Sequence, residues 1–210
     1  MAKSESSPTE DEVIQPYITA LGALTVWWAS LENTLLHVAE RLTGLDELTT
    51  QCLLDNFERA SGRASIVKKL ALRPNPPSEV WQDCIVDLCD LISNEWGNER
   101  NRLIHDEWNF DERAVSRSRA GTKIGKSKAH GRKTLLPLPP SKLTHWEIYD
   151  LTEKVMHAAV QLQFLSVGFT LWRDTGKPPR VPQQAIWLSK GNLPADFQQD
   201  ESAPPAQPQS

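Results

Sequence analysis

Residues 21–42 read LGALTVWWASLENTLLHVAERL. Large apolar residues recur in this stretch at steps of three and four, which is the spacing of one buried face of an α-helix. Gly44 follows closely and favours the end of that helix, because glycine readily adopts the left-handed conformation that closes many helices. The stretch therefore predicts a long amphipathic helix with a buried seam of Leu21, Leu24, Trp28, Leu31, Leu35, Val38 and Leu42.

Two later segments repeat this spacing. The first follows Ser78, a residue type that caps helix N-termini, and extends to about residue 105. The second begins at Ser141 or Thr144 and ends at Gly176, which a lysine and two prolines follow. The seam of the first comprises Trp81, Cys84, Ile85, Leu88, Leu91 and Ile92, and that of the second comprises Ile148, Leu151, Val155, Ala158, Leu162, Leu165, Phe169 and Trp172.

Two shorter helical patterns, at about 46–58 and 61–72, connect the first long helix to the second. We therefore predict an all-α fold: a helical bundle of three long and two shorter helices, with a basic loop or hairpin insert and disordered termini. Most of the insert is predicted to be a loop, with a short strand within 134–140. The predicted divisions are a disordered N-terminus at 1–10, a helical domain at 11–175 with the insert at about 109–141, and a Pro/Gln-rich, mostly disordered tail at 176–210.

The composition of the 210-residue chain narrows the class of protein. No apolar run approaches the ~20 residues that span a membrane, and the polar, acidic N-terminus argues against a secretory signal. Three cysteines without a CxxC pair favour a reduced compartment and no metal site. We therefore expect a cytoplasmic protein without a membrane partner, a metal or another cofactor.

Charge is distributed unevenly along the chain. The formal net charge is −4, which gives no general argument for binding nucleic acid. Between Asp111 and Lys133, however, eight basic residues stand against two acidic ones, so the local net charge is +6. Such an insert suits contact with phosphates, although a basic flexible segment is more often simply solvated.

The second long helix ends with a polar motif. Residues 99–108 read ERNRLIHDEW, which places Asn101 directly after Arg100 and His105 five residues after that arginine. Arginine is a permanent cation whose shape matches two phosphate oxygens, and histidine can exchange a proton near neutral pH. Together they suit the binding of a phosphodiester and the movement of a proton beside it.

Helix geometry limits how this motif acts. Five residues correspond to about 140° around an α-helix, so Arg100 and His105 do not share one face. A site built from both needs either a helix end or a second chain. The apolar seam also turns polar here, because its continuation falls on Glu95, Glu99 and Arg102. We expect this polar stretch to leave the core or to build a site, as the polar seam of a dimer would.

The arrangement Arg-Asn-x-x-x-His on the third main helix of a small bundle resembles the HEPN superfamily. The resemblance covers roughly residues 20–172 in helix order, and its specific residues are Arg100 to His105. It implies a usually dimeric, metal-independent ribonuclease with Arg100 and His105 as catalytic residues and Asn101 as a polar orienting residue. It departs at Glu107, where some toxins of the superfamily carry a tyrosine.

A physical mechanism accompanies this resemblance. A neutral His105 can take the proton of a ribose 2′-OH, while Arg100 stabilises the charge that builds on the phosphoryl oxygens. We therefore expect an endoribonuclease, as a toxin or defence effector, with RNA as substrate, a homodimeric state, and an antitoxin or regulatory partner. The residues expected to bind RNA are Arg102, Arg113, Arg117, Arg119, Lys123, Lys126, Lys128, Arg132 and Lys133.

Two alternatives stay open at this point. The motif can be a solvated helix end in which Arg100 and Arg102 interact with the helix dipole and His105 hydrogen-bonds a carbonyl. The chain is then either a non-catalytic RNA-binding or protein-interaction helical dimer, or a purely structural interaction protein that uses its heptad seams and disordered tails.

Overall fold

A computed structural model of the chain describes residues 10–55, 57, 59–111, 114–118, 122–126, 133–137 and 141–191. The helices are α1 (Glu10–Thr43), α2 (Glu47–Leu54), α3 (Ala60–Ala71), α4 (Glu79–Asp90), the π-helix η1 (Leu91–Trp96), α5 (Gly97–His105), α6 (His145–Thr175) and α7 (Gln183–Ser189). The strands are β1 (Glu107–Asp111), β2 (Ala114–Ser118), β3 (Thr122–Lys126), β4 (Lys133–Pro137) and β5 (Ser141–Lys142).

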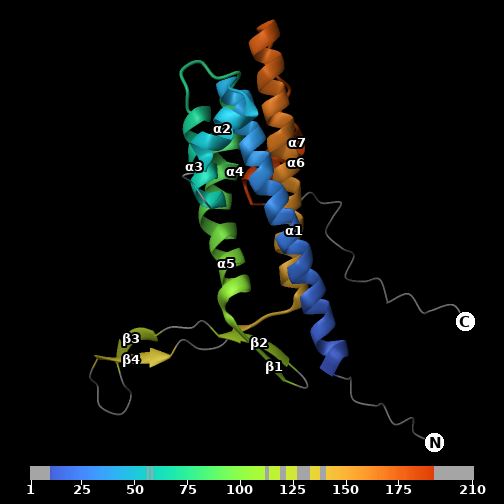
Figure 1. Ribbon diagram of the computed structural model, residues 1–210, viewed down its shortest axis with the longest axis vertical. Helices are drawn as coiled ribbons and strands as arrows, with labels where there is room; N and C mark the ends of the chain where they lie inside the picture. The colour runs from blue at the N-terminus through green and yellow to red at the C-terminus, as the bar shows by residue number, and fades with distance from the viewer. Residues whose placement is uncertain are drawn as a thin grey trace, which may run out of the picture.

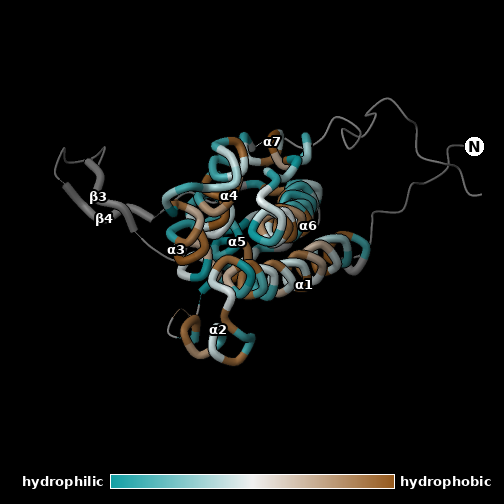
Figure 2. The backbone as a smooth tube through the Cα atoms, turned by 90° about the horizontal axis from the view of Figure 1, so that it is seen from above, coloured by the Kyte–Doolittle hydropathy of each residue, from teal (hydrophilic) through white to brown (hydrophobic). Residues whose placement is uncertain are grey.

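The long helices form an elongated bundle (Figure 1). α1 packs along α6, and α3 packs against both α1 and α4. The segments α4, η1 and α5 follow one another without a break and form the third long helix. Viewed from above, α1, α3, α4, α6 and α7 surround a common centre (Figure 2). The predicted all-α bundle with three long helices is confirmed.

The core consists of the predicted apolar seams. On α1 every seam residue after Leu21 is buried, and Leu21 itself is partly buried against the core. On α6 the seam from Ile148 to Phe169 is buried, and Trp172 packs partly against it. The Trp81 side chain on α4 stacks on Phe169, and its indole N–H donates to the Leu165 carbonyl at 2.8 Å. The seams therefore join α1, α4 and α6 in one core.

The predicted helix ends are also confirmed. Ser78 caps α4 by accepting a hydrogen bond from the backbone N–H of Trp81. Thr144, rather than Ser141, caps α6, and it forms a reciprocal capping box with Glu147. At the other ends, Gly44 and Gly176 have φ values of 75° and 71°, the left-handed conformation that glycine adopts without steric cost.

The π-helix η1 explains why the predicted seam fails before the motif. A π-helical turn holds more residues than an α-helical turn, so the positions that face the core move along the sequence. As a result Trp96 is buried while Glu95 is exposed, and Leu103 is the next buried residue after Gly97. Glu95, which continues the predicted apolar seam, therefore does not lie in the core. Glu99 and Arg102 are half-buried at its edge.

The basic insert is more regular than predicted. Strands β1, β2 and β5 form a three-stranded antiparallel sheet, and β3 pairs with β4 in a second antiparallel sheet. The hairpin expected as one form of the insert is present as β3 and β4, and β4 is the short strand expected within 134–140. The strands β1, β2 and β5 were not predicted. The reason is that these strands are short and polar, so they lack the apolar alternation that identifies a strand.

The structure describes the first part of the predicted tail, as far as residue 191. Residues 177–182 run back along α6, and α7 then packs against α4 and α6. Ala185 and Leu188 of α7 are buried in the core. Residues 1–9 and 192–210, which make up most of the predicted disordered termini, lie outside the described residues.

In the described part of the chain, α6 is the one helix whose length and composition would allow it to cross a membrane, with a mean hydropathy of 1.2. However, 44% of that apolar stretch is buried inside the bundle. Core packing therefore accounts for much of its apolar character.

We predict that Gly97→Ala destabilises the protein. A Cβ at this position would lie 2.7 Å from the Ile92 carbonyl oxygen and 3.9 Å from the Trp28 ring, so η1 would have to shift. We expect a loss of about 1–3 kcal/mol in the free energy of unfolding, as for other overpacked sites, measured by chemical denaturation. The control is Gly22→Ala on α1, where a Cβ meets nothing within 4 Å, and this variant should be up to about 1 kcal/mol more stable than wild type. Equal effects of the two substitutions would contradict the prediction.

Candidate functional site

The Arg-Asn-x-x-x-His motif lies on α5, at the end of the long helix that begins with α4. His105 is the last helical residue, and the following Asp106 is extended, with φ −70° and ψ 151°. The backbone N–H of Asp106 still donates to the Arg102 carbonyl at 2.9 Å, which closes the final turn. His105 is exposed at this end, where an external group can reach its imidazole.

Arg100 is held on the side of α5 that faces α1. Its guanidinium carbon lies 5.7 Å from the centroid of the Trp28 ring, within the range of a cation–π interaction. One guanidinium nitrogen donates to the Asn101 side-chain oxygen at 3.2 Å. The Nε atom of Arg100 is buried and has no hydrogen-bond partner among the described residues. Trp28 and Asn101 therefore orient a half-buried arginine that retains an unused donor.

The motif does not assemble within one chain. Five residues place His105 about 7.5 Å further along the helix axis than Arg100 and about 140° around it. In the described structure no hydrogen bond or ion pair joins the two side chains. The fold thus brings Arg100 together with Asn101 and leaves His105 apart, and the catalytic roles of all three residues stay predictions.

Two acidic residues compensate the positive charge of Arg102. It forms ion pairs with Glu99 at 3.6 Å and with Asp106 at 3.4 Å, one turn before and one turn after it. The Asp106 side chain is largely buried, which strengthens its interaction with the arginine relative to a fully exposed pair. Arg102 therefore offers a phosphate less uncompensated charge than the sequence suggested.

The side chain of Arg117 on β2 is buried and does not face solvent. Its side chain is only 4% exposed and forms an ion pair with Glu99 of α5. This contact ties the three-stranded sheet to the helix that carries the motif. Arg117 was expected to bind RNA, but its burial leaves little of the side chain accessible to a phosphate. The sequence of the insert gives no sign that Glu99, on α5, would bind the guanidinium.

The other basic residues of the insert divide into two groups. Lys123 and Lys126 lie on β3 and Lys133 lies on β4, where the register sets Lys126 directly opposite Lys133. The remaining predicted contacts, Arg113, Arg119, Lys128 and Arg132, lie outside the described residues.

Aromatic residues support the helix end beside His105. The Trp108 indole N–H donates to the Leu103 carbonyl at 2.9 Å, and the Trp108 ring meets Tyr17 edge-on at 6.1 Å. The Tyr17 hydroxyl donates to the Leu143 carbonyl at 3.0 Å. Burial, together with the Glu147 carboxylate, raises the pKa of Tyr17 above its ordinary value. Trp108 thus packs against the end of α5, as a core-edge residue does.

Among the described residues, no group of three or more His, Cys, Asp or Glu side chains is arranged to hold a metal ion. Cys84 and Cys89 are buried, and desolvation raises the pKa of both thiols, whereas Cys52 is exposed.

Comparisons of the chain with protein-family models, with curated proteins and with solved structures give no match.

Sequence analysis missed two residues of this region. Trp28 was assigned to the α1 core seam, and it is indeed buried, but the guanidinium of Arg100 also lies over its ring. Glu99 was noted only as a polar residue in an apolar seam, whereas it binds both Arg102 and Arg117. The signal available in the sequence was the carboxylate of Glu99 at a position where the predicted seam is apolar.

We predict that Glu99→Ala loosens the attachment of the sheet to α5. The substitution removes the carboxylate from a buried guanidinium, which we expect to cost about 1–3 kcal/mol in the free energy of unfolding. Hydrogen exchange should increase at β2 more than at α3. The matched control is Glu95→Ala, an exposed glutamate on the same long helix, which should change stability by less than about 0.5 kcal/mol. The prediction is wrong if the Glu99 variant exchanges like wild type at β2.

Proposed function

We propose that this chain is a metal-independent endoribonuclease of HEPN type, with Arg100, Asn101 and His105 as its catalytic residues. The observation that carries the proposal is the helix end itself. Trp28 and Asn101 orient a half-buried arginine, and an exposed histidine ends the same helix five residues later. These are the two groups that metal-free cleavage of RNA requires, a phosphate-binding cation and a proton acceptor.

The proposed reaction uses the nucleophile that RNA already contains. His105 removes the proton from the 2′-hydroxyl, and the 2′-oxygen forms a bond to the adjacent phosphorus. The bond from phosphorus to the 5′-oxygen breaks, and that oxygen takes a proton from water. Arg100 stabilises the charge on the phosphoryl oxygens as it builds up. The products are a 2′,3′-cyclic phosphate and a 5′-hydroxyl end.

A second chain would complete the site. Arg100 faces α1 and His105 lies on another side of α5, so one copy does not direct both groups at one phosphodiester. In the proposed homodimer, Arg100 of one copy meets the partner subunit's His105. A regulatory protein that covers the exposed end of α5 would block this site, which is the action expected of an antitoxin on a toxin or defence effector in the cytoplasm.

The hairpin of β3 and β4 would contact the RNA backbone. Its strands carry Lys123, Lys126 and Lys133, which supply positive charge. Such contacts depend on salt and carry no sequence preference. Arg117 takes no part in this role, because it is buried against Glu99.

The alternative function is a non-catalytic RNA-binding or protein-interaction helical dimer. The contact of Arg100 with Trp28 favours it, since a cation–π interaction alone can account for an arginine at this position. Cleavage assays separate the two functions.

We predict that the wild-type protein cleaves single-stranded RNA in EDTA and that His105→Ala reduces the rate by about 10²–10⁴, the usual contribution of a general base. Product ends should be 2′,3′-cyclic phosphate and 5′-hydroxyl. The matched control is His37→Ala, which changes an exposed histidine on α1 that pairs with Glu40. If wild type and the His105 variant cleave equally, or if neither cleaves, the chain is not this enzyme, and retained RNA binding would then support the alternative.

A mixing experiment tests whether two chains share the site. We predict that Arg100→Ala and His105→Ala are each inactive alone and recover about a quarter of wild-type activity when mixed in equal amounts. Half of the dimers then contain both variants, and each of these holds one intact site of two. A site formed within a single chain predicts no recovery, and that result would remove the second chain from the proposed mechanism.

A further inference from the structure

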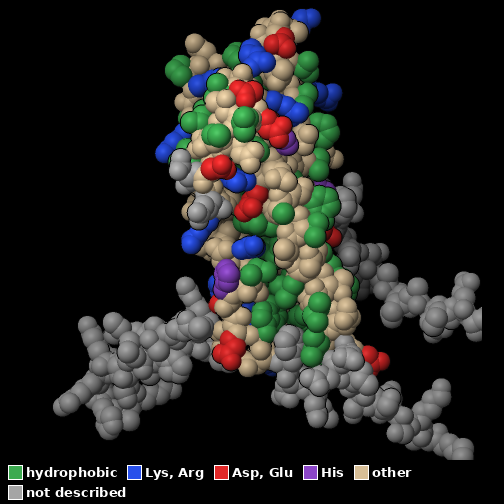
Figure 3. All heavy atoms as spheres, in the orientation of Figure 1, with side chains coloured by type: hydrophobic (Ala, Val, Ile, Leu, Met, Phe, Trp, Pro, Cys, Tyr) green, Lys and Arg blue, Asp and Glu red, His purple; other side chains and the backbone are tan. Residues whose placement is uncertain are grey.

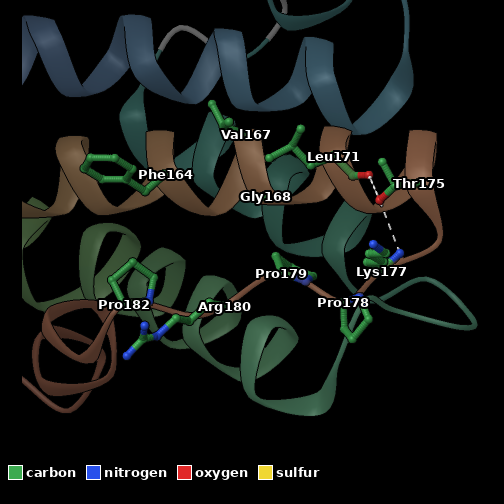
Figure 4. Close-up of a pocket in the computed structure, with 10 residues that line it drawn as sticks. All are labelled: Phe164, Val167, Gly168, Leu171, Thr175, Lys177, Pro178, Pro179, Arg180 and Pro182. Atoms are coloured by element: carbon green, nitrogen blue, oxygen red, sulfur yellow. Dashed lines mark hydrogen bonds between the residues drawn. The ribbon is translucent and has the colours of Figure 1, made fainter.

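A hollow lies on the surface of α6, between the helix and residues 177–182. Its volume is about 460 Å³, and Phe164, Val167 and Leu171 line it from the helix (Figure 4). These three side chains are between 40% and 59% exposed. Hydrophobic side chains are visible at the surface over α1 and α6 in Figure 3. The hollow can therefore receive an apolar side chain from outside the described residues.

The sequence of α6 indicates that this side of the helix is covered. Between Lys154 and Arg173 the helix contains no Asp, Glu, Lys or Arg. A helix with one side in water normally places charged residues on that side. Contiguous exposed apolar surface usually marks a contact. The hollow and the uncharged stretch of helix thus both point to a segment that lies over them.

The two charged residues that line the hollow are both basic. Arg180 lies at one end of it, with Phe164 and Pro182, and Lys177 lies at the other end, with Thr175 (Figure 4). Both basic residues are exposed, and among the described residues neither forms an ion pair. A segment that suits this hollow therefore combines a large apolar residue with acidic residues.

The chain contains such a segment directly after α7. Residues 192–210 follow the described part of the chain, and their large apolar residues are Leu193 and Phe197. Their charged residues are all acidic, namely Asp196, Asp200 and Glu201. The charge of this segment is thus opposite to the charge of the hollow.

The length of the chain allows Phe197 to reach the hollow. Pro182, which lines the hollow, is also the N-cap of α7, and the seven residues of α7 span about 10 Å. At the other end of α7, Gly191 has a φ of 77°, a left-handed conformation that turns the chain away from the helix direction. The six residues from there to Phe197 span up to about 20 Å when extended. The segment can therefore return past α7 to the hollow.

We propose that residues 192–201 lie along the hollow of the same chain, with Phe197 packed beside Phe164. Asp196 then lies beside Arg180, and Glu201 approaches Lys177. The spacing supports this direction, because Phe164 and Thr175 are about 16 Å apart along the helix and residues 197–201 span about 14 Å when extended. Covalent attachment gives the segment a high effective concentration at the hollow.

This contact is separate from the proposed ribonuclease site. The hollow belongs to the C-terminal half of α6, while α5 ends near the start of α6, at the other end of the elongated bundle (Figure 1). The bound segment covers the apolar side chains of α6, and its release exposes them to other molecules. The inference does not rest on the proposed function, and either can fail alone.

Disulfide trapping in the full chain tests the contact. In a Cys52→Ser background, which removes the exposed native thiol, Thr175→Cys and Ser202→Cys place one thiol at the end of the hollow and the other just after the acidic residues. We expect mild oxidation to join these thiols within one chain. The matched control carries the same substitutions together with Phe197→Asp, and it should cross-link at least about tenfold more slowly, because the tether is unchanged and only the apolar anchor is lost.

Two results of this trapping would overturn the proposal. The first is an equal rate with and without Phe197, since chance encounters of the segment would then explain the cross-link. The second is a disulfide that joins two chains instead of one, because the segment of a second copy would then occupy the hollow.

A charge exchange tests the direction of the segment. Arg180→Glu should slow the cross-link between positions 175 and 202, because it places a carboxylate beside Asp196. Asp196→Lys in the same chain should restore the rate. Neither substitution is adjacent to a thiol in the sequence. If the first substitution has no effect, or if the second does not restore the rate, Asp196 does not lie beside Arg180 and the proposal is wrong.

Discussion

The packing of Trp28 on α1 connects the core of the bundle to the helix that carries the motif. Its ring is buried in the seam between the long helices, and its indole N–H donates to Glu32 at 3.1 Å. The ring also lies against Gly97 at the start of α5 and beneath the guanidinium of Arg100. Because one rigid side chain makes all these contacts, the packing of the core and the orientation of Arg100 depend on each other.

The π-helix η1 has a similar double effect. It moves the buried positions of the long helix, so that Trp96 and Leu103 enter the core and Glu95 faces solvent. The same shift brings Glu99 to the edge of the core, where it binds Arg102 and Arg117. A regular α-helix would place these groups on other faces of the helix. The local irregularity is therefore what allows the insert to attach beside the motif.

Sequence predicted those parts of the fold that depend on local rules. The seams of α1 and α6, the caps at Ser78 and Thr144, and the glycine ends at Gly44 and Gly176 follow from periodicity and backbone preference, which act over a few residues. The register shift at η1, the strands of the insert and the burial of Arg117 depend on contacts between distant segments. The candidate site was predictable as a set of residues, but its geometry was not, because Trp28 approaches Arg100 only in the folded bundle.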